Sequence, residues 1–340
     1  MRELYKQIED RLEKVKFEEL FKDFKRYDFA LYNDLYVYLS DKTIPYDNRF
    51  IGNTAIYYEN NYLAIWRIDG DISIDRLASK LIHEMFHAFQ MDKSDSRFPN
   101  EFKALEYRYV IDNVKLKYIE TKHLIDAFIK NDANEYAIFH SLRKNRNDFF
   151  KEEVEYEQKV ETIEGMARFV EIMSLKHLNP SLYAIEIDEM LKKLGNKRSY
   201  HPIRVISYEI GALIMLYAKQ THIDIGHDLS SETRPIKDMI QANYIKNIEI
   251  ENEEFDIDFI TSFYKDLDKA ISKLIRESNS NHEFDFIIGF DPLNTHYYNG
   301  YLYCKHFILF SKDSKNQFIK SECVVDMKEK RIIEKKMPDN

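Results

Sequence analysis

Apolar residues recur almost continuously at helical spacing between Ile74 and about residue 277, and this long stretch constrains the fold most. Glycine and proline, with 8 and 7 residues in 340, are each about 2% of the chain, well below the usual ~7% and ~5%. Such scarcity favours helices over tight loops. The helical pattern is interrupted only by short segments, near residues 94–100, 130–134, 179–180, 195–196 and 226.

Short runs of β-branched and aromatic residues flank this helical stretch. Residues 34–68 contain three such runs, with a turn at residues 59–61, which predicts a small sheet that ends in a hairpin. Residues 2–27 predict one amphipathic helix before it. We therefore expect an α+β, mainly helical fold, with a domain of residues 1–280 and a small antiparallel β extension at 281–340. The extension's strands are expected at residues 284–290, 300–310, 318–325 and 331–333.

Charge and segment composition exclude several function classes. The net charge of -9 argues against a basic surface for nucleic acid or for an anionic membrane. No run approaches the ~20 apolar residues of a membrane span, and the first residues lack the apolar core of a secretory signal. Cys304 and Cys323 match no paired metal or redox spacing, so we expect free thiols and a cytoplasmic protein.

The segment from His83 to His87 contains the pattern H-E-x-x-H, with Glu84 as its acid. Two histidines four residues apart on a helix project from one face and can both reach a single Zn²⁺ ion. We expect this helix over residues 74–91. Its apolar residues fill about half of the circumference, and the histidines lie opposite that arc. The pair is therefore predicted to point outward, and two solvent-exposed surface histidines are the first alternative interpretation. Hydrogen-bonded core histidines are a second alternative, which is disfavoured because the pair lies outside the apolar arc.

A third ligand is expected elsewhere, because catalytic zinc sites usually have three protein ligands and one open position. Glu164 is the best candidate, on a helix expected over residues 160–176 that is otherwise apolar on its packed face. Gly165 destabilises a helix by roughly 0.5–1 kcal/mol relative to alanine, which indicates a close neighbour there. The alternative is an ordinary surface face, with Glu164 paired to Arg168. Glu161, one turn earlier, could orient a ligating histidine or simply be exposed.

These two motifs resemble those of the gluzincins, the thermolysin-like zinc metallopeptidases, in which a later helix supplies a glutamate ligand through an E-G-x-A type motif, here at residues 164–167. The resemblance implies a thermolysin-like zinc core with His83, His87 and Glu164 as metal ligands. It also implies that Glu84 is the general base. The long segment between the motifs includes charge-rich helices at residues 101–160, which we expect to form an insertion.

An oxyanion usually needs a donor besides the metal, and similar chains often carry a Tyr or His donor on a later helix. Tyr208 and His201 are the candidates here, although a packed aromatic is an alternative role for Tyr208. Weaker features are a turn-like stretch in which Asp224 and Asp228 flank His227, a possible cation site, and an acidic run at residues 249–258, expected to be a solvated helix start.

Together these features predict zinc-dependent hydrolysis of peptide bonds, with Zn²⁺ activating a water molecule and Glu84 taking its proton. A peptide or protein substrate would add as a strand to an exposed edge of the sheet, at one of the two hairpin strands within residues 51–67. Two other functions remain open. One is a non-catalytic zinc-binding protein with a regulatory or interaction role, and the other is a hydrolase of non-peptide amides.

Overall fold

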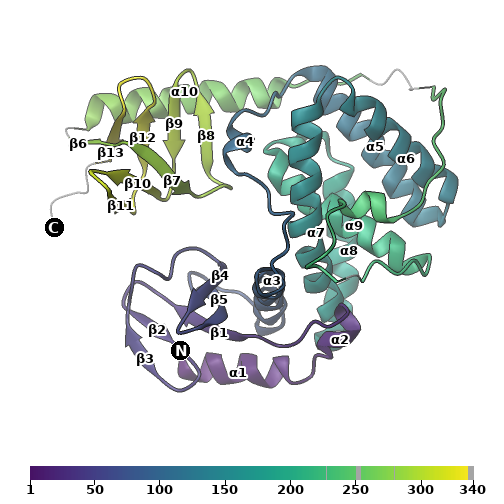
Figure 1. Cartoon of the computed structure of the whole chain (residues 1–340), viewed down its shortest axis with the longest axis horizontal. Coiled ribbons are helices and arrows are strands. Elements are labelled where there is room, and N and C mark those ends of the chain that lie inside the picture. Colours follow the sequence, from purple (N-terminus) through teal and green to yellow (C-terminus); the bar gives the residue numbers. More distant parts are fainter. Residues whose placement is uncertain (227, 250–253, 279, 336–340) are drawn as a thin grey trace. The chain divides into compact units, whose positions relative to one another are not determined.

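The computed structural model describes residues 1–226, 228–249, 254–278 and 280–335. The fold is α+β, with about 49% helix and 18% strand, as the sequence predicts. None of the described helices combines the length and the apolar character needed to cross a membrane. The chain divides into two compact units, one of residues 1–99 and 116–250 and one of residues 100–115 and 251–340 (Figure 1).

The second unit begins earlier than the boundary expected at residue 280. Helix α10 (Asp258–Glu277) precedes that boundary but packs against strands of the C-terminal sheet. Its apolar face carries Leu267, Ile271 and Leu274, all buried in one cluster with Val324 of that sheet. An amphipathic helix is stable where its apolar face is covered, so α10 belongs to the β unit that covers it.

The first unit contains a five-stranded sheet in the order β3-β2-β1-β5-β4. Strands β1 and β5 are parallel, and the other neighbours are antiparallel. The predicted hairpin is β4–β5, and its two turn residues Glu59 and Asn60 have φ values of 46° and 67°, which a tight type I′ turn requires. The strands are β1 (Asp28–Tyr32), β2 (Tyr36–Tyr38), β3 (Thr43–Pro45), β4 (Thr54–Tyr58) and β5 (Asn61–Arg67).

The single helix predicted over residues 2–27 is wrong. Helix α1 (Arg2–Leu12) ends early, and only one further turn, α2 (Phe17–Leu20), forms before the chain becomes extended at Phe21. The rings of Phe21 and Phe24 each pack 5.1 Å from the ring of Phe86. Burial of both rings therefore outweighs the local helical pattern. Strand β1, which follows, was not predicted because its near-continuous burial shows no two-residue alternation.

Most of the first unit after the sheet, up to residue 220, is helical. The helix expected over residues 74–91 is α3 (Ile74–Asp92), which begins after the Ser73 N-cap. The helix expected from residue 160 begins earlier, because α7 is one 28-residue helix that includes the end of the expected insertion. The α-helices between α3 and residue 220 are α4 (Phe102–Leu105), α5 (Ile111–Lys130), α6 (Ala133–Asn147), α7 (Lys151–Leu178), α8 (Pro180–Leu194) and α9 (Ile203–Gln220). Helix α4 and the first residues of α5 belong to the second unit.

The helical pattern expected up to residue 277 is wrong between α9 and α10. The described residues there form turns and irregular backbone around one short 3₁₀ turn, Ile236–Met239. Carboxylates fix two of the turns, because Asp224 accepts from the N–H of Gly226 at 2.9 Å and Asp228 accepts from that of Ser230 at 3.1 Å. Both acids of the candidate cation site thus serve the local backbone. His227 lies outside the described residues, as do residues 250–253 of the acidic run.

Helices α7 and α9 touch through two glycines. A Cβ atom on Gly165 would lie 2.8 Å from the carbonyl carbon of Gly211, and one on Gly211 would lie 2.7 Å from the Cα of Gly165. Both distances are far inside van der Waals contact, so neither position has space for a side chain. The close neighbour expected at Gly165 is therefore the backbone of α9.

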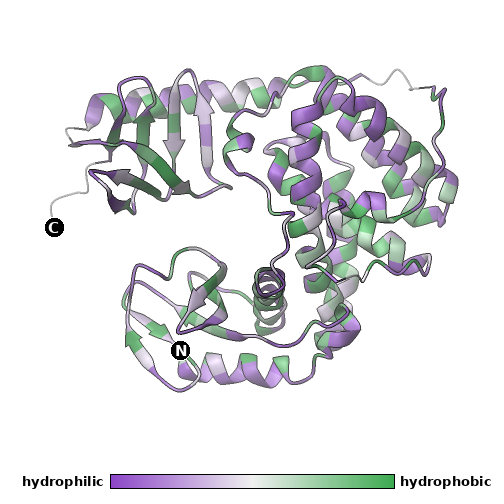
Figure 2. Ribbon diagram, in the orientation of Figure 1, coloured by the Kyte–Doolittle hydropathy of each residue, from purple (hydrophilic) through white to green (hydrophobic). Residues whose placement is uncertain are grey.

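The second unit contains two antiparallel sheets, β11-β10-β7 and β6-β13-β12-β9-β8. Hydrophobic residues cover much of β7 and β12 (Figure 2). The runs expected as single strands at residues 300–310 and 318–325 each divide between the two sheets, because the chain crosses from one sheet to the other. The strands are β6 (Ser280–Glu283), β7 (Phe286–Phe290), β8 (Thr295–Tyr298), β9 (Tyr301–Cys304), β10 (Ile308–Lys312), β11 (Lys315–Ile319), β12 (Cys323–Asp326) and β13 (Arg331–Glu334).

The two cysteines lie directly opposite each other in the larger of these sheets. Cys304 of β9 and Cys323 of β12 are paired in the antiparallel register. Both are fully buried free thiols. Their sequence separation gave no sign of this proximity, because strand pairing joins residues that are distant along the chain.

Candidate metal centre

The histidine pair of α3 is buried. His83 is 8% exposed and His87 is 7% exposed. The interpretation as two surface histidines is therefore wrong, and so is the prediction that the pair points outward. Both rings project from α3 outside its apolar arc, as expected. Helix α7 packs on the face that carries them and covers them. A projection of one helix cannot show what a second helix covers.

Three potential metal-binding atoms from α3 and α7 converge. The Nε2 atom of His87 lies 3.1 Å from the Nε2 atom of His83 and 3.1 Å from the Oε2 atom of Glu164. The distance from His83 Nε2 to Glu164 Oε2 is 3.4 Å. The structure thus brings together the two histidines and the glutamate, which are distant in sequence.

Gln90 determines which nitrogen of His87 carries the hydrogen. The side-chain amide of Gln90 donates to the carbonyl oxygen of Ile163 at 3.0 Å. Its Oε1 atom therefore faces Nδ1 of His87, at 2.8 Å, and can only accept. Nδ1 of His87 must then be the donor, which leaves a lone pair on Nε2 toward Glu164.

Glu171 has the same effect on His83. Its Oε2 atom lies 3.1 Å from Nδ1 of His83, and its Oε1 atom accepts from Arg168 at 2.6 Å. An ionised carboxylate only accepts hydrogen bonds, so Nδ1 of His83 donates to it. Burial raises the pKa of Glu171, but the charges of Arg168 and Lys80 and the contact with His83 lower it far more. Glu171 is therefore ionised.

The converging atoms attract positive charge. With both Nδ1 atoms as donors, two imidazole lone pairs and a carboxylate oxygen face one another at 3.1–3.4 Å. Three acceptors at such distances need a cation between them. In the absence of a metal ion a proton can serve: burial alone would lower the pKa of His83, but Glu164, Glu171 and Glu84 raise it to about 10. A metal ion can take the same place.

Glu84 is also part of this group. One potential ligand atom each from His83, Glu84 and His87 lie within 4.8 Å of one another, so this buried group could hold a metal ion. Burial raises the pKa of Glu84, although the two histidines lower it in part. No described residue forms a hydrogen bond or ion pair with its carboxylate. Glu84 therefore lies beside the converging atoms with its oxygens uncommitted to the rest of the described protein.

Helix α9 supplies two further side chains. Arg204 donates from Nη2 to Oε1 of Glu164 at 2.6 Å. The ring of Tyr208 lies 6.2 Å from the ring of His83, at an angle of 20° between the planes. Tyr208 is half-buried, and the guanidinium of Arg204 lies 5.5 Å from the centre of its ring. Tyr208 is thus near the histidine pair, whereas His201 is half-buried just before α9 begins.

Glu161 and Arg168 differ from the expected roles. Glu161 is 1% exposed, and its carboxylate accepts from Lys117 and from Arg143 rather than from a histidine. Both interpretations of Glu161, as a partner of a ligating histidine and as an exposed residue, are therefore wrong. Arg168 pairs with Glu171, Glu186 and Glu209 rather than with Glu164, so the surface-pair alternative for Glu164 is wrong too.

Three neighbours of the candidate ligands, Gln90, Glu171 and Arg204, were not predicted from the sequence. Gln90 follows His87 by three residues and Glu171 follows Glu164 by seven, so both share a helix face with a ligand candidate. That spacing is a signal that could have found them. Arg204 gave no such signal, because its contact with Glu164 depends on how α9 packs against α7.

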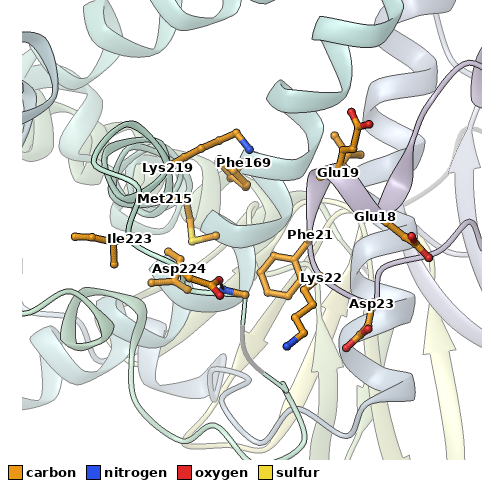
Figure 3. Close-up of a pocket in the computed structure, with 13 residues that line it drawn as sticks. Glu18, Glu19, Phe21, Lys22, Asp23, Phe169, Met215, Lys219, Ile223 and Asp224 are labelled. Atoms are coloured by element: carbon orange, nitrogen blue, oxygen red, sulfur yellow. Dashed lines mark hydrogen bonds between the residues drawn. The ribbon is translucent and has the colours of Figure 1, made fainter.

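A separate cavity of about 440 Å³ lies elsewhere in the first unit (Figure 3). Phe21, Phe169, Met215 and Ile223 line its apolar part, and exposed charged residues from the α2 region and from the end of α9 surround it. None of the three converging ligand atoms belongs to a lining residue. This cavity is therefore not part of the candidate metal centre.

In comparisons with protein families, curated proteins and solved structures, nothing matched this chain.

Proposed function

We propose that this chain is a zinc-dependent hydrolase that cleaves peptide bonds, with a metal centre of the thermolysin-like, gluzincin type. The observation that carries the proposal is the convergence of His83 Nε2, His87 Nε2 and Glu164 Oε2 at 3.1–3.4 Å. Zinc ligands about 2.0–2.1 Å from the ion and at tetrahedral angles are about 3.3–3.4 Å apart. The spacing of these atoms fits that value closely.

The type of donor also supports zinc. Two imidazole nitrogens and one carboxylate suit Zn²⁺ and its transition-metal neighbours, whereas Ca²⁺ and Mg²⁺ prefer oxygen ligands. The partners of the ligands fit as well. Glu171 and the Gln90 amide oxygen accept from the Nδ1 atoms of the two histidines, which is how ligating histidines are usually oriented.

The residues around the donors can perform peptide hydrolysis. When bound, zinc supplies a Lewis acid that polarises a carbonyl group and lowers the pKa of a water molecule. The carboxylate of Glu84, which lies beside the histidine nitrogens, would accept a proton and return it to the leaving amine. Tyr208, whose ring lies 6.2 Å from that of His83, is the first candidate donor to a developing oxyanion, and His201 is the second candidate.

Strand β4 is the candidate site for an extended substrate. It is an edge strand of the sheet and packs beside α3. The two-residue turn makes Tyr58 and Asn61 a hydrogen-bonded pair, and such pairs alternate along the hairpin. The N–H and C=O groups of Ala55 and Tyr57 therefore point to the free edge, where a peptide can pair with them.

Replacing Glu84 by Gln tests the catalytic part of the proposal. The change keeps the shape of the side chain but removes its ability to take a proton. We expect zinc content to be unchanged and turnover of a peptide library to fall about 10²- to 10⁴-fold. The control is Glu13→Gln, which removes one exposed charge at the end of α1. Wild-type turnover by Glu84→Gln would show that Glu84 is not the base.

The same experiment separates the other functions. Stoichiometric zinc without cleavage of any peptide would favour a non-catalytic regulatory or interaction protein. Cleavage confined to amides that are not peptides would favour a different hydrolase that uses the same centre.

A further inference from the structure

Arg204 holds one of the two carboxylate oxygens of Glu164. Its Nη2 atom donates to Oε1 at 2.6 Å, while Oε2 faces the histidine pair. The two oxygens of this carboxylate thus serve two different partners. The arginine itself is only 6% exposed. A charge-assisted hydrogen bond in such a buried place is strong and directional.

The backbone of α9 cannot easily move away from this contact. Gly165, the residue after Glu164, packs against Gly211 of α9 with no space for a Cβ atom on either residue. The guanidinium of Arg204 also lies 5.5 Å from the centre of the Tyr208 ring. Arg204 is therefore fixed relative to Glu164 by the packing of two helices.

The charge of Arg204 also acts on the donor strength of Glu164. A carboxylate that shares its charge with a guanidinium is a weaker donor to a metal ion. Without Arg204, Oε1 of Glu164 would be a buried acceptor that has lost its hydrogen bond, which is unfavourable. A bound metal ion would then attract Oε1 as well as Oε2.

We propose that Arg204 is a positioning residue that restricts Glu164 to a single donor oxygen and so preserves an open coordination position. This inference rests on the proposed function, because an open position matters only where water or substrate must reach the metal. A purely structural salt bridge would keep α7 and α9 together but would not change how many oxygens Glu164 offers.

Cobalt substitution tests the inference without any substrate. Four-coordinate Co²⁺ has intense visible absorption bands, and the bands weaken several-fold when a fifth ligand is added. We expect the intense spectrum for the wild-type protein loaded with Co²⁺. Arg204→Met should give the weak spectrum at saturating Co²⁺, because Oε1 becomes a second donor. Arg204→Lys should keep most of the intensity, since its ammonium group can still hold Oε1.

Turnover provides a second measurement. Arg204→Met should lower kcat about 10- to 100-fold with little change in KM. Arg198→Met is the matched control, because Arg198 is exposed in the turn before α9. It should have the wild-type spectrum and turnover.

Two results would overturn the inference. One is an intense, unchanged cobalt spectrum in Arg204→Met, whatever happens to its activity. The other is a weak spectrum in the wild-type protein itself, and this result needs no variant to fold. Failure of the proposed function gives a different result: a wild-type protein that binds Co²⁺ with the intense spectrum but cleaves no peptide.

Discussion

Helix α7 carries two groups of buried carboxylates, and the two groups differ in how their charges are balanced. The first group, which we name the ionic cluster, is formed with α5 and α6. Its carboxylates and cations are all at most 1% exposed and contact one another directly, as in the 2.8 Å pairs Lys117–Glu157 and Arg143–Glu161. The members of the ionic cluster are Lys117, Glu120, Arg143, Arg146, Glu157 and Glu161.

The second group is the candidate metal centre, which begins one turn later on the same helix. Here two imidazole lone pairs and one carboxylate oxygen point at one another, and the carboxylate of Glu84 has no partner among the described residues. In the ionic cluster each of the three carboxylates contacts at least two of the basic side chains directly. The number of buried charges therefore does not distinguish a metal site from a structural network, whereas the convergence of two imidazole nitrogens and a carboxylate oxygen on one point does.

The largest effect is expected when the balance of the ionic cluster is broken. Lys117→Met removes one buried cation from beside Glu157 and Glu161, each of which then keeps a single arginine partner of the cluster, Arg146 or Arg143. Breaking a buried ion pair in this way destabilises a protein by about 3–5 kcal/mol. Chemical denaturation should show that loss, whereas the control Lys159→Met, at an exposed position of α7, should show almost none. A loss below 1 kcal/mol would mean that the cluster is not needed for stability.

Acid should also destabilise the protein, because it protonates the carboxylates of the ionic cluster. Burial raises the pKa values of Glu157 and Glu161, but the charges of Lys117 and the neighbouring arginines lower both values more. Their stabilising effect is complete above the unfolded pKa of about 4.3 and is lost as pH falls below it. Each carboxylate should contribute a slope of up to about 1.4 kcal/mol per pH unit, measurable by denaturation between pH 5 and 3. Stability that is flat over this range would contradict the assignment.

A smaller effect is expected at the contact between α7 and α9, which affects the metal centre. Gly211→Ala places a Cβ against the Cα of Gly165 and the carbonyl oxygen of Glu161. Overpacking of this kind destabilises by about 1–3 kcal/mol. The displaced α9 should also weaken Zn²⁺ binding, measured by competition with a chelator. Gly195→Ala is the control, because its nearest neighbour is 3.5 Å away, and an equal effect in both variants would exclude the helix contact as the cause.

The smallest effect is expected at the free edge of β4. Tyr57→Pro removes an outward N–H group but no bond of the sheet, so the fold should be retained. Loss of one hydrogen bond to substrate, ~0.5–1.5 kcal/mol, should raise KM roughly 2- to 12-fold. Tyr57→Thr is the matched control, because it loses the exposed ring and keeps the N–H group. If Tyr57→Thr raises KM as much as Tyr57→Pro, the ring rather than the strand edge binds substrate.

The sequence predicts local features of this chain well. The α+β class is confirmed, and helix α3 agrees with its expected bounds to one residue. The interior Gly165 correctly indicated a close neighbour. Each of these depends on a short segment whose pattern is complete in itself.

Features that depend on contacts between distant segments could not be predicted. The burial of His83 depends on a helix that begins 68 residues later, at Lys151. Glu161 was interpreted either as a partner of a ligating histidine or as an exposed residue, but its carboxylate accepts from Lys117 and Arg143 instead. The contact between Arg204 and Glu164 likewise exists only because two glycines let their helices touch.

Metal analysis of the purified protein tests the central claim most directly. The measurement is zinc stoichiometry and affinity for the wild-type chain and for Glu164→Gln, after incubation with Zn²⁺ and removal of loosely bound metal. We predict one tightly bound zinc ion per wild-type chain and a large loss of affinity in the variant. A wild-type protein that retains no zinc, or a Glu164→Gln protein that binds it as tightly as the wild type, would contradict the proposed centre.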